Sequence, residues 1–194
     1  DLISPDLMMP GVSDVEVSQV GGARAVIGAG SIGNVGLTYY QAGGKKITAT
    51  PGLRSTVTGA DINTTFGSLG VAAEWATTEP NDALLLEPGF AGTDGNNTAW
   101  NAKLNFNVGS LAVGAGFGTI ETNYAAPGYW SRLGRAVNLT NVTGPMANVS
   151  YALGSNVTLT AEGSFLQPDD ETAGVLVSGR DAITQGRVVS TTAS

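Results

Sequence analysis

The sequence predicts an all-β protein whose antiparallel strands run up and down, and three observations support that prediction. The first is strict alternation in "WNAKLNFNV", residues 100–108, which puts five apolar residues on one side of a strand and only Asn and Lys on the other. The second is the dipeptide Gly109-Ser110 that follows, which is typical of a two-residue hairpin turn. The third is the absence of any helix-length apolar pattern in a chain with 28 glycines.

The N-terminal half is expected to contribute several strands. In "NVGLTYYQA" the apolar positions are Val35, Leu37 and Tyr39, and Gly43-Gly44 is predicted to turn the chain into "KKITAT". In "SLGVAAEWAT" the apolar positions are Leu69, Val71, Ala73 and Trp75. Weaker candidates are Asp14–Val20, Ala23–Gly30, Leu53–Ala60, Ile62–Gly67 and, near the C-terminus, Gly174–Gly179.

The C-terminal half repeats the hairpin pattern. The strand after Gly109-Ser110, "LAVGAGFGT", alternates apolar residues with Ala and Gly, and "ANVSYAL" turns at Gly154-Ser155 into "NVTLTAEGSF". Longer connections are expected at 77–97, 122–144 and 167–173. The sequence therefore predicts about 10–12 strands in a single domain, 1–194, with short turns at one end and long polar loops at the other.

The composition excludes several function classes. The net charge is -7 and the pI is about 4.4, which argues against a nucleic-acid partner. The chain has no Cys and no His, so thiolate chemistry, imidazole zinc sites and the usual general base are all unavailable. We therefore expect no enzyme activity, and the residues by themselves indicate no cofactor and no metal site. No apolar run reaches the length of a transmembrane helix.

A G-x-G-x-x-G match at Gly28, Gly30 and Gly33 resembles a dinucleotide-binding fingerprint. That motif requires a helix after the last glycine and an acidic residue about 20 positions further on. Here β-formers and further glycines follow, and the next acidic residue is Asp61. We interpret these glycines as small residues on a crowded face of a curved sheet.

Two interpretations of the alternating strands remain open on pattern alone. In a soluble β-sandwich the apolar face is the core. In a transmembrane β-barrel, or an arc of a larger barrel, the apolar face meets lipid and the polar face lines the interior. Strands of nine or ten residues, an uncharged polar face and aromatic residues near strand ends favour the barrel.

The barrel interpretation assigns a side to particular residues. Those expected to face the lumen are Glu74, Asn101, Lys103, Asn105, Asn107 and Glu162. Those expected to face lipid are Trp100, Leu104, Phe106, Val108, Leu159 and Phe165.

Other motifs have ordinary explanations. The acidic residues Asp169–Glu171 are expected to form an exposed loop tip rather than a cation site. Six Asn-x-Ser/Thr triplets, among them those at Asn141 and Asn148, arise from an Asn- and Thr-rich composition and are not read as glycosylation sites.

The segment "PGYWSRLGRAVNLTNVTGP", residues 127–145, resembles the β-barrel region of the large S-layer and outer-membrane proteins of the Deinococcus–Thermus lineage. It does so through its "GYW-R-G" cluster and the "N-TN-TGP" pattern that follows. The resemblance is best over residues 124–168. The family's S-layer homology module is not visible, and the closing "STTAS" lacks the terminal aromatic residue usual in outer-membrane barrels.

This resemblance implies a structural, pore-forming protein of the outer membrane or S-layer that passes small solutes passively. It also implies a homotrimer that contacts membrane lipid and other envelope or cell-wall components. The resemblance alone implies a carotenoid or a structural cation as a ligand. The alternative function is a secreted β-sandwich adhesin or carbohydrate-binding module.

Overall fold

The computed structural model describes most of the chain. The described residues are 15–28, 30, 33–46, 53–80, 95–124, 126, 132–133, 136–137, 139–154, 157–170, 175–177, 180–183 and 188–193.

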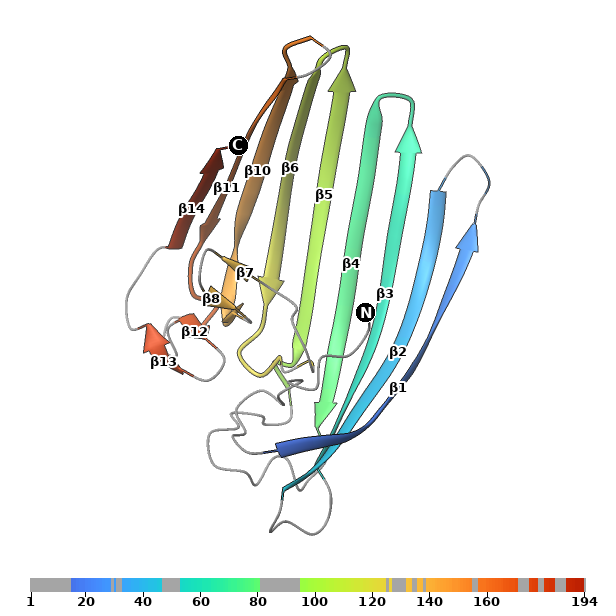
Figure 1. Cartoon of the computed structure of the whole chain (residues 1–194), viewed down its shortest axis with the longest axis vertical. Helices are drawn as coiled ribbons and strands as arrows, with labels where there is room; N and C mark the ends of the chain where they lie inside the picture. Colours follow the sequence, from blue (N-terminus) through green and yellow to red (C-terminus); the bar gives the residue numbers. More distant parts are fainter. Residues whose placement is uncertain are drawn as a thin grey trace.

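One antiparallel sheet of nine strands dominates the structure, in the order β1-β2-β3-β4-β5-β6-β10-β11-β14. Figure 1 shows these strands side by side in a single curved layer. Their bounds are β1 Val15–Gly28, β2 Gly33–Lys46, β3 Leu53–Phe66, β4 Leu69–Pro80, β5 Thr98–Val108, β6 Leu111–Ile120, β10 Val142–Ala152, β11 Thr158–Leu166 and β14 Val188–Ala193.

Five short strands form two small sheets near the lower end of β10 and β11 in Figure 1. One sheet has the order β13-β12-β9 and the other pairs β7 with β8. Their bounds are β7 Arg132–Leu133, β8 Ala136–Val137, β9 Leu139–Thr140, β12 Val175–Val177 and β13 Arg180–Ile183. The predicted strand Gly174–Gly179 therefore corresponds to β12, which the structure makes shorter.

The two ends of the sheet differ, as the sequence predicted. At the upper end in Figure 1 each hairpin turn contains a Gly-Ser dipeptide, and its glycine has a positive φ that L-residues rarely adopt. The φ angles are 65° at Gly30, 60° at Gly67, 57° at Gly109 and 80° at Gly154. At the lower end the strands are joined by much longer connections, which include residues 81–97 and 121–141.

The predicted turn at Gly43-Gly44 is wrong. Strand β2 continues through both glycines to Lys46, where Gly43 pairs with Gln19 on one side and with Arg54 on the other. A Gly-Gly dipeptide reads locally as a turn, but strands on both sides offer its backbone hydrogen bonds that hold it extended. Likewise β1 and β3 are each one strand where the sequence suggested two.

The up-and-down antiparallel fold class is confirmed. Every pair of neighbouring strands in the large sheet runs antiparallel, and most neighbours are consecutive in the chain. Within the described ranges the sheet is open, with β1 at one edge and β14 at the other. Among the described residues the buried apolar cluster is small: Leu139 and Val142 pack against Ile120 and Leu166.

Candidate functional site: the two faces of the sheet

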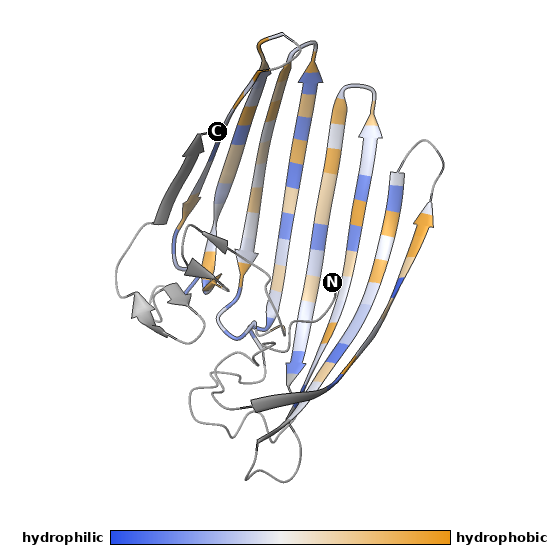
Figure 2. Ribbon diagram, in the orientation of Figure 1, coloured by the Kyte–Doolittle hydropathy of each residue, from blue (hydrophilic) through white to orange (hydrophobic). Residues whose placement is uncertain are grey.

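The strand register collects the apolar side chains on one face of the sheet from β1 to β11. One row runs directly from strand to strand through Phe66, Leu69, Phe106, Val113, Val149 and Ala161. A second row runs through Ile27, Val35, Ile62, Ala73, Ala102 and Phe117. We call this side the apolar face. It gives the alternating orange and blue bands along the strands in Figure 2.

The apolar face is uncovered. The exposed fractions of Leu104, Phe106, Leu159 and Phe165 are 52%, 48%, 55% and 46%. In a β-sandwich these side chains would be buried against a second sheet, and the described strands supply no such layer. A continuous, exposed apolar surface of this extent is far larger than a soluble monomer normally presents.

Aromatic side chains border the apolar face at both ends. Toward the long connections lie Tyr39, Trp75, Trp100, Phe117 and Phe165, and toward the tight turns lie Phe66, Phe106 and Tyr151. The rings of Trp100 and Phe117 stack with centroids 5.9 Å apart. Two residues beyond the aromatic side chains at the long-connection end, the same face becomes polar. The polar residues there are Gln41, Thr77, Thr98, Thr119 and Gln167. The apolar face is therefore a band with defined limits.

The opposite side, which we call the polar face, carries the six residues predicted to face a lumen. Glu74 lies directly opposite Asn101, whose Nδ2 donates a hydrogen bond of 3.3 Å to Glu74 Oε2. Glu162 lies opposite Asn148. Lys103, Asn105 and Asn107 follow on the same side of β5, opposite Gly116, Gly114 and Ala112.

The polar face is the inner side of the curved sheet. Along β6 the apolar residues from Leu111 to Phe117 are exposed, whereas Gly114 and Gly116 between them are half-buried and Gly118 is buried. Side chains converge on the concave side of a curved sheet and diverge on the convex side, so less exposure at smaller residues marks the concave side. Small residues on that side allow the curvature.

Glycines on the polar face let polar side chains reach across a whole strand. Arg24 on β1 and Asp61 on β3 form an ion pair of 2.7 Å over β2, and Arg24 also donates a 2.7 Å hydrogen bond to Thr38. Gly36 lies beneath this pair, where a Cβ atom would contact Asp61 Oδ2 and would lie 2.5 Å from Arg24 Nη2. The local sequence carries no signal of this pair, because its members are 37 residues apart.

Gly114 has the same role on β6. It lies in register between Asn105 and Asn148, and a Cβ atom at this position would contact the amide oxygens of both side chains. Gly116 similarly lies beneath Lys103 and Met146. Amide and charged side chains therefore line the polar face, and they extend over glycine residues of the neighbouring strands.

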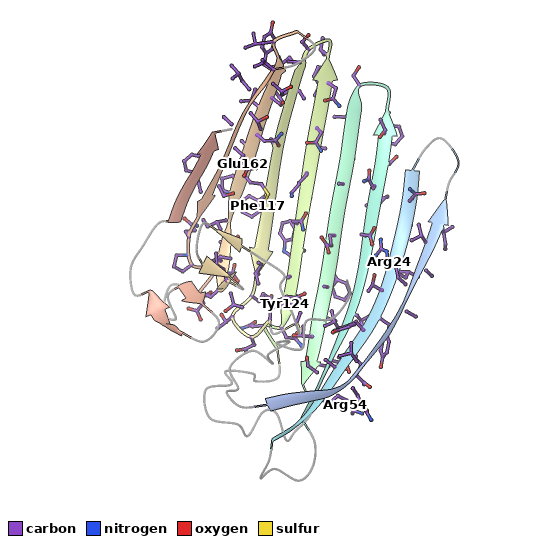
Figure 3. The ribbon with its side chains drawn as sticks, viewed as in Figure 1. Arg24, Arg54, Phe117, Tyr124 and Glu162 are labelled. Carbon is purple, nitrogen blue, oxygen red and sulfur yellow. The ribbon has the colours of Figure 1, made fainter. Side chains whose placement is uncertain are left out.

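At the lower end the connection that follows β6 contains buried side chains. Tyr124 and Ala126 are 6% and 7% exposed, and Figure 3 shows Tyr124 near the lower ends of β5 and β6. Burial, together with the negative charge of Glu74, raises the pKa of Tyr124 to about 12.

Asn141 forms hydrogen bonds to the segments that follow β6 and β11. Its side chain is fully buried and its backbone has φ of 55°. Asn141 Nδ2 donates to the Asp170 carbonyl at 2.9 Å, and Oδ1 accepts from the Asp170 N–H at 2.6 Å and from Thr122 Oγ1 at 3.3 Å. Asp169 and Asp170 themselves are exposed, as predicted for the acidic tip. The pKa of Asp169 is raised by partial burial and by the negative charges of Glu121 and Asp170.

Metal ligation and helical membrane crossing have no support in the described part of the chain. No group of three or more acidic side chains there is arranged to hold a metal ion. No helix within those residues combines the length and hydropathy needed to cross a membrane.

Comparison with known protein families identifies the chain's relatives. The family model for the β-barrel domain of the S-layer protein SlpA matches residues 10–159. The chain belongs to this S-layer β-barrel family. The match extends far to the N-terminal side of the segment that carried the resemblance in the sequence, and it takes in β1 to β6 and β10. No curated protein and no solved structure matches the chain.

Membership of this family fixes the general role of the chain. It is a structural β-barrel domain of an S-layer protein and belongs to the cell envelope. The family is a structural one rather than a family of enzymes.

Proposed function

We propose that this chain forms part of the wall of a transmembrane pore in the outer membrane, with lipid on its apolar face and a water-filled lumen on its polar face. The observation that carries the proposal is the uncovered apolar band, with aromatic residues at both limits and a polar row beyond. In outer-membrane barrels such aromatic girdles flank the lipid-facing surface.

The height of the band supports this proposal. From Trp100 to Val108 the apolar face spans nine residues, or about 27 Å along the strand at roughly 3.4 Å per residue. For strands tilted by roughly 40°, this length projects to about 21 Å along the membrane normal, close to the apolar band of roughly 25 Å in known barrels.

The stagger of the hairpins supports a tilt of that size. The row of directly paired residues that runs through Phe66 and Ala161 crosses three hairpins. The two paired residues of a hairpin are separated in sequence by 3 positions in β3–β4, by 7 in β5–β6 and by 12 in β10–β11. Each tight turn therefore lies about two residues further along its strands than the previous one, or about one residue per strand. With roughly 3.3 Å per residue and 4.8 Å between strands, level turns require a tilt of about 35–40°.

Passage of solutes through the pore is passive. The six predicted lumen residues, Glu74, Asn101, Lys103, Asn105, Asn107 and Glu162, supply amide and charged groups that keep water in the channel. Closed strand pairing satisfies the backbone against lipid, so the arc described here requires further strands to complete a barrel. Because short turns are usually periplasmic, we assign the Gly-Ser turns to the periplasm and the long connections to the exterior.

Following the resemblance noted in the sequence, we propose a homotrimer that contacts envelope and cell-wall components. The test is planar-bilayer conductance of the purified protein, with heat-modifiable gel migration as a control for a folded barrel. Stepwise conductance that disappears on boiling is the expected result. A freely soluble, detergent-independent monomer without conductance contradicts the proposal and leaves the adhesin alternative.

A further inference from the structure

Two carboxylates of the polar face lie directly opposite each other on neighbouring strands. Asp61 on β3 pairs with Glu74 on β4. The next residue of β4 is Trp75, which belongs to the aromatic border toward the long connections. Opposed side chains on antiparallel strands have Cβ atoms about 4.5–5.5 Å apart, so like charges at such positions repel each other. The folded protein must therefore relieve the repulsion between these two negative charges.

The two carboxylates extend away from each other. Asp61 extends over β2, where its Oδ2 lies against the position that a Cβ at Gly36 would occupy, and it forms the 2.7 Å ion pair with Arg24. Glu74 extends toward β5, where its Oε2 accepts the 3.3 Å hydrogen bond from Asn101 Nδ2. A cation therefore neutralises Asp61, whereas Glu74 keeps its negative charge beside a neutral amide.

The nearby lysine of the polar face does not compensate Glu74. Lys103 lies on β5, diagonally opposite Glu74. Its side chain extends the other way, over Gly116 on β6, and its Cγ lies 2.9 Å from the position of a Cβ there. A further carboxylate of the polar face, Glu162, lies on β11, toward the β14 edge of the arc (Figure 3). Neither Glu74 nor Glu162 forms an ion pair with a described residue.

From these contacts we propose that the lumen passes small cations in preference to anions, and that Glu74 determines this preference at the exterior end. The Arg24–Asp61 pair limits the preference, because it cancels the charge of the carboxylate opposite Glu74. The proposal rests on the pore function above and adds the class of solute that the pore favours, hydrated inorganic cations such as K⁺. Carboxylates that line a pore are a general means of selecting cations, and lumen-facing residues tune the selectivity of β-barrels.

The experiment measures the K⁺/Cl⁻ permeability ratio of the purified protein, from reversal potentials in planar bilayers under a KCl gradient at low salt. Glu74→Gln and Arg24→Gln each remove one charge of the polar face, and the two charges have opposite signs. The matched control is Glu79→Gln. Glu79 is an exposed glutamate on the same strand as Glu74, but its parity along β4 puts it on the opposite side of the wall.

We expect the wild type to favour K⁺. Glu74→Gln is expected to lower the permeability ratio by about twofold or more, and Glu79→Gln to leave it unchanged. Arg24→Gln is expected to raise the ratio by about twofold, because it leaves Asp61 charged and without its cation. Low salt is used because the Debye length is about 30 Å at 0.01 M, so a single charge acts across much of the lumen.

The other outcomes overturn the proposal. A conducting wild type that favours Cl⁻, or a folded Glu74→Gln with the ratio of the wild type, contradicts the cation preference and leaves the pore function intact. Equal effects of Glu74→Gln and Glu79→Gln contradict the role of the polar face. A wild type without conductance ends the pore function and this proposal with it. Heat-modifiable gel migration checks that each variant folds; should Glu74→Gln not fold, an unchanged ratio in Arg24→Gln overturns the proposal.

Discussion

The most direct test of the two faces places the same charge on consecutive residues of β5. Leu104 is on the apolar face and 52% exposed, whereas Asn105 is on the polar face and half-buried. Leu104 is four residues from both Trp100 and Val108, so it lies about 13 Å along the strand from each limit of the band. In the proposed membrane that position is close to the bilayer midplane.

The expected costs differ strongly. A lysine on the lipid face at the midplane costs roughly 2–4 kcal/mol, so Leu104→Lys is expected to raise the equilibrium constant for unfolding by about 30- to 700-fold. Asn105→Lys exchanges one polar lumen group for another and is expected to stay within about 0.5–1 kcal/mol of the wild type. If the apolar face met water instead, Leu104→Lys would cost no more than Asn105→Lys.

The assay is guanidinium unfolding of the protein in phosphatidylcholine vesicles, followed by tryptophan fluorescence. A clearly lower midpoint for Leu104→Lys alone supports the assignment of the faces. Equal midpoints for the two variants refute the lipid-facing assignment, and with it the transmembrane proposal.

Three further predictions follow from the same structure. The pKa of Tyr124 is raised from 10 to about 12, so about 2–3 kcal/mol of folding stability that is present below pH 10 is lost as the pH rises toward 12. The unfolding midpoints of the wild type and Tyr124→Phe are therefore expected to diverge above pH 10, and parallel pH profiles contradict the burial of Tyr124. Gly144 has φ of 155° and a Cβ there would contact the Phe165 carbonyl, so Gly144→Ala is expected to cost roughly 1–3 kcal/mol of folding stability. Gly114→Ala is expected to cost less, because the added Cβ meets only the ends of Asn side chains, which can move away. Thermal melts compare the two variants, and equal losses of stability are inconsistent with this explanation. Because the chain has no Cys, Asp169→Cys and Ser110→Cys each provide one label site; a membrane-impermeant maleimide on intact cells is expected to label Asp169→Cys alone, and the opposite pattern reverses the assigned orientation.

The faces of the strands were predictable because a period of two depends only on the local sequence. The alternation over Trp100–Val108 specified which side chains share a side, and the register in the structure extends that side from β1 to β11. The Gly-Ser turns were predictable for a similar reason, since a positive φ favours glycine at a fixed position.

Errors and omissions came from contacts between distant segments. Gly43 and Gly44 remain in a strand because partners on both sides hold them there, and those partners cannot be read from the dipeptide. The Arg24–Asp61 ion pair requires knowing that Gly36 lies between the two strands. Asn141 appeared only as part of a tripeptide pattern, although it bonds to Asp170, 29 residues away.

The order of strands in the sheet also bears on how such a domain is made. From β1 to β6 each strand pairs with the one before it in the chain, so a newly formed hairpin always finds its docking edge already present. Contacts between consecutive strands keep loop closures short, which favours rapid, strand-by-strand formation of the sheet. The exceptions are the joins of β6 to β10 and β11 to β14, where an intervening segment must be set aside before the next strand can dock. We expect pauses in assembly at those two joins.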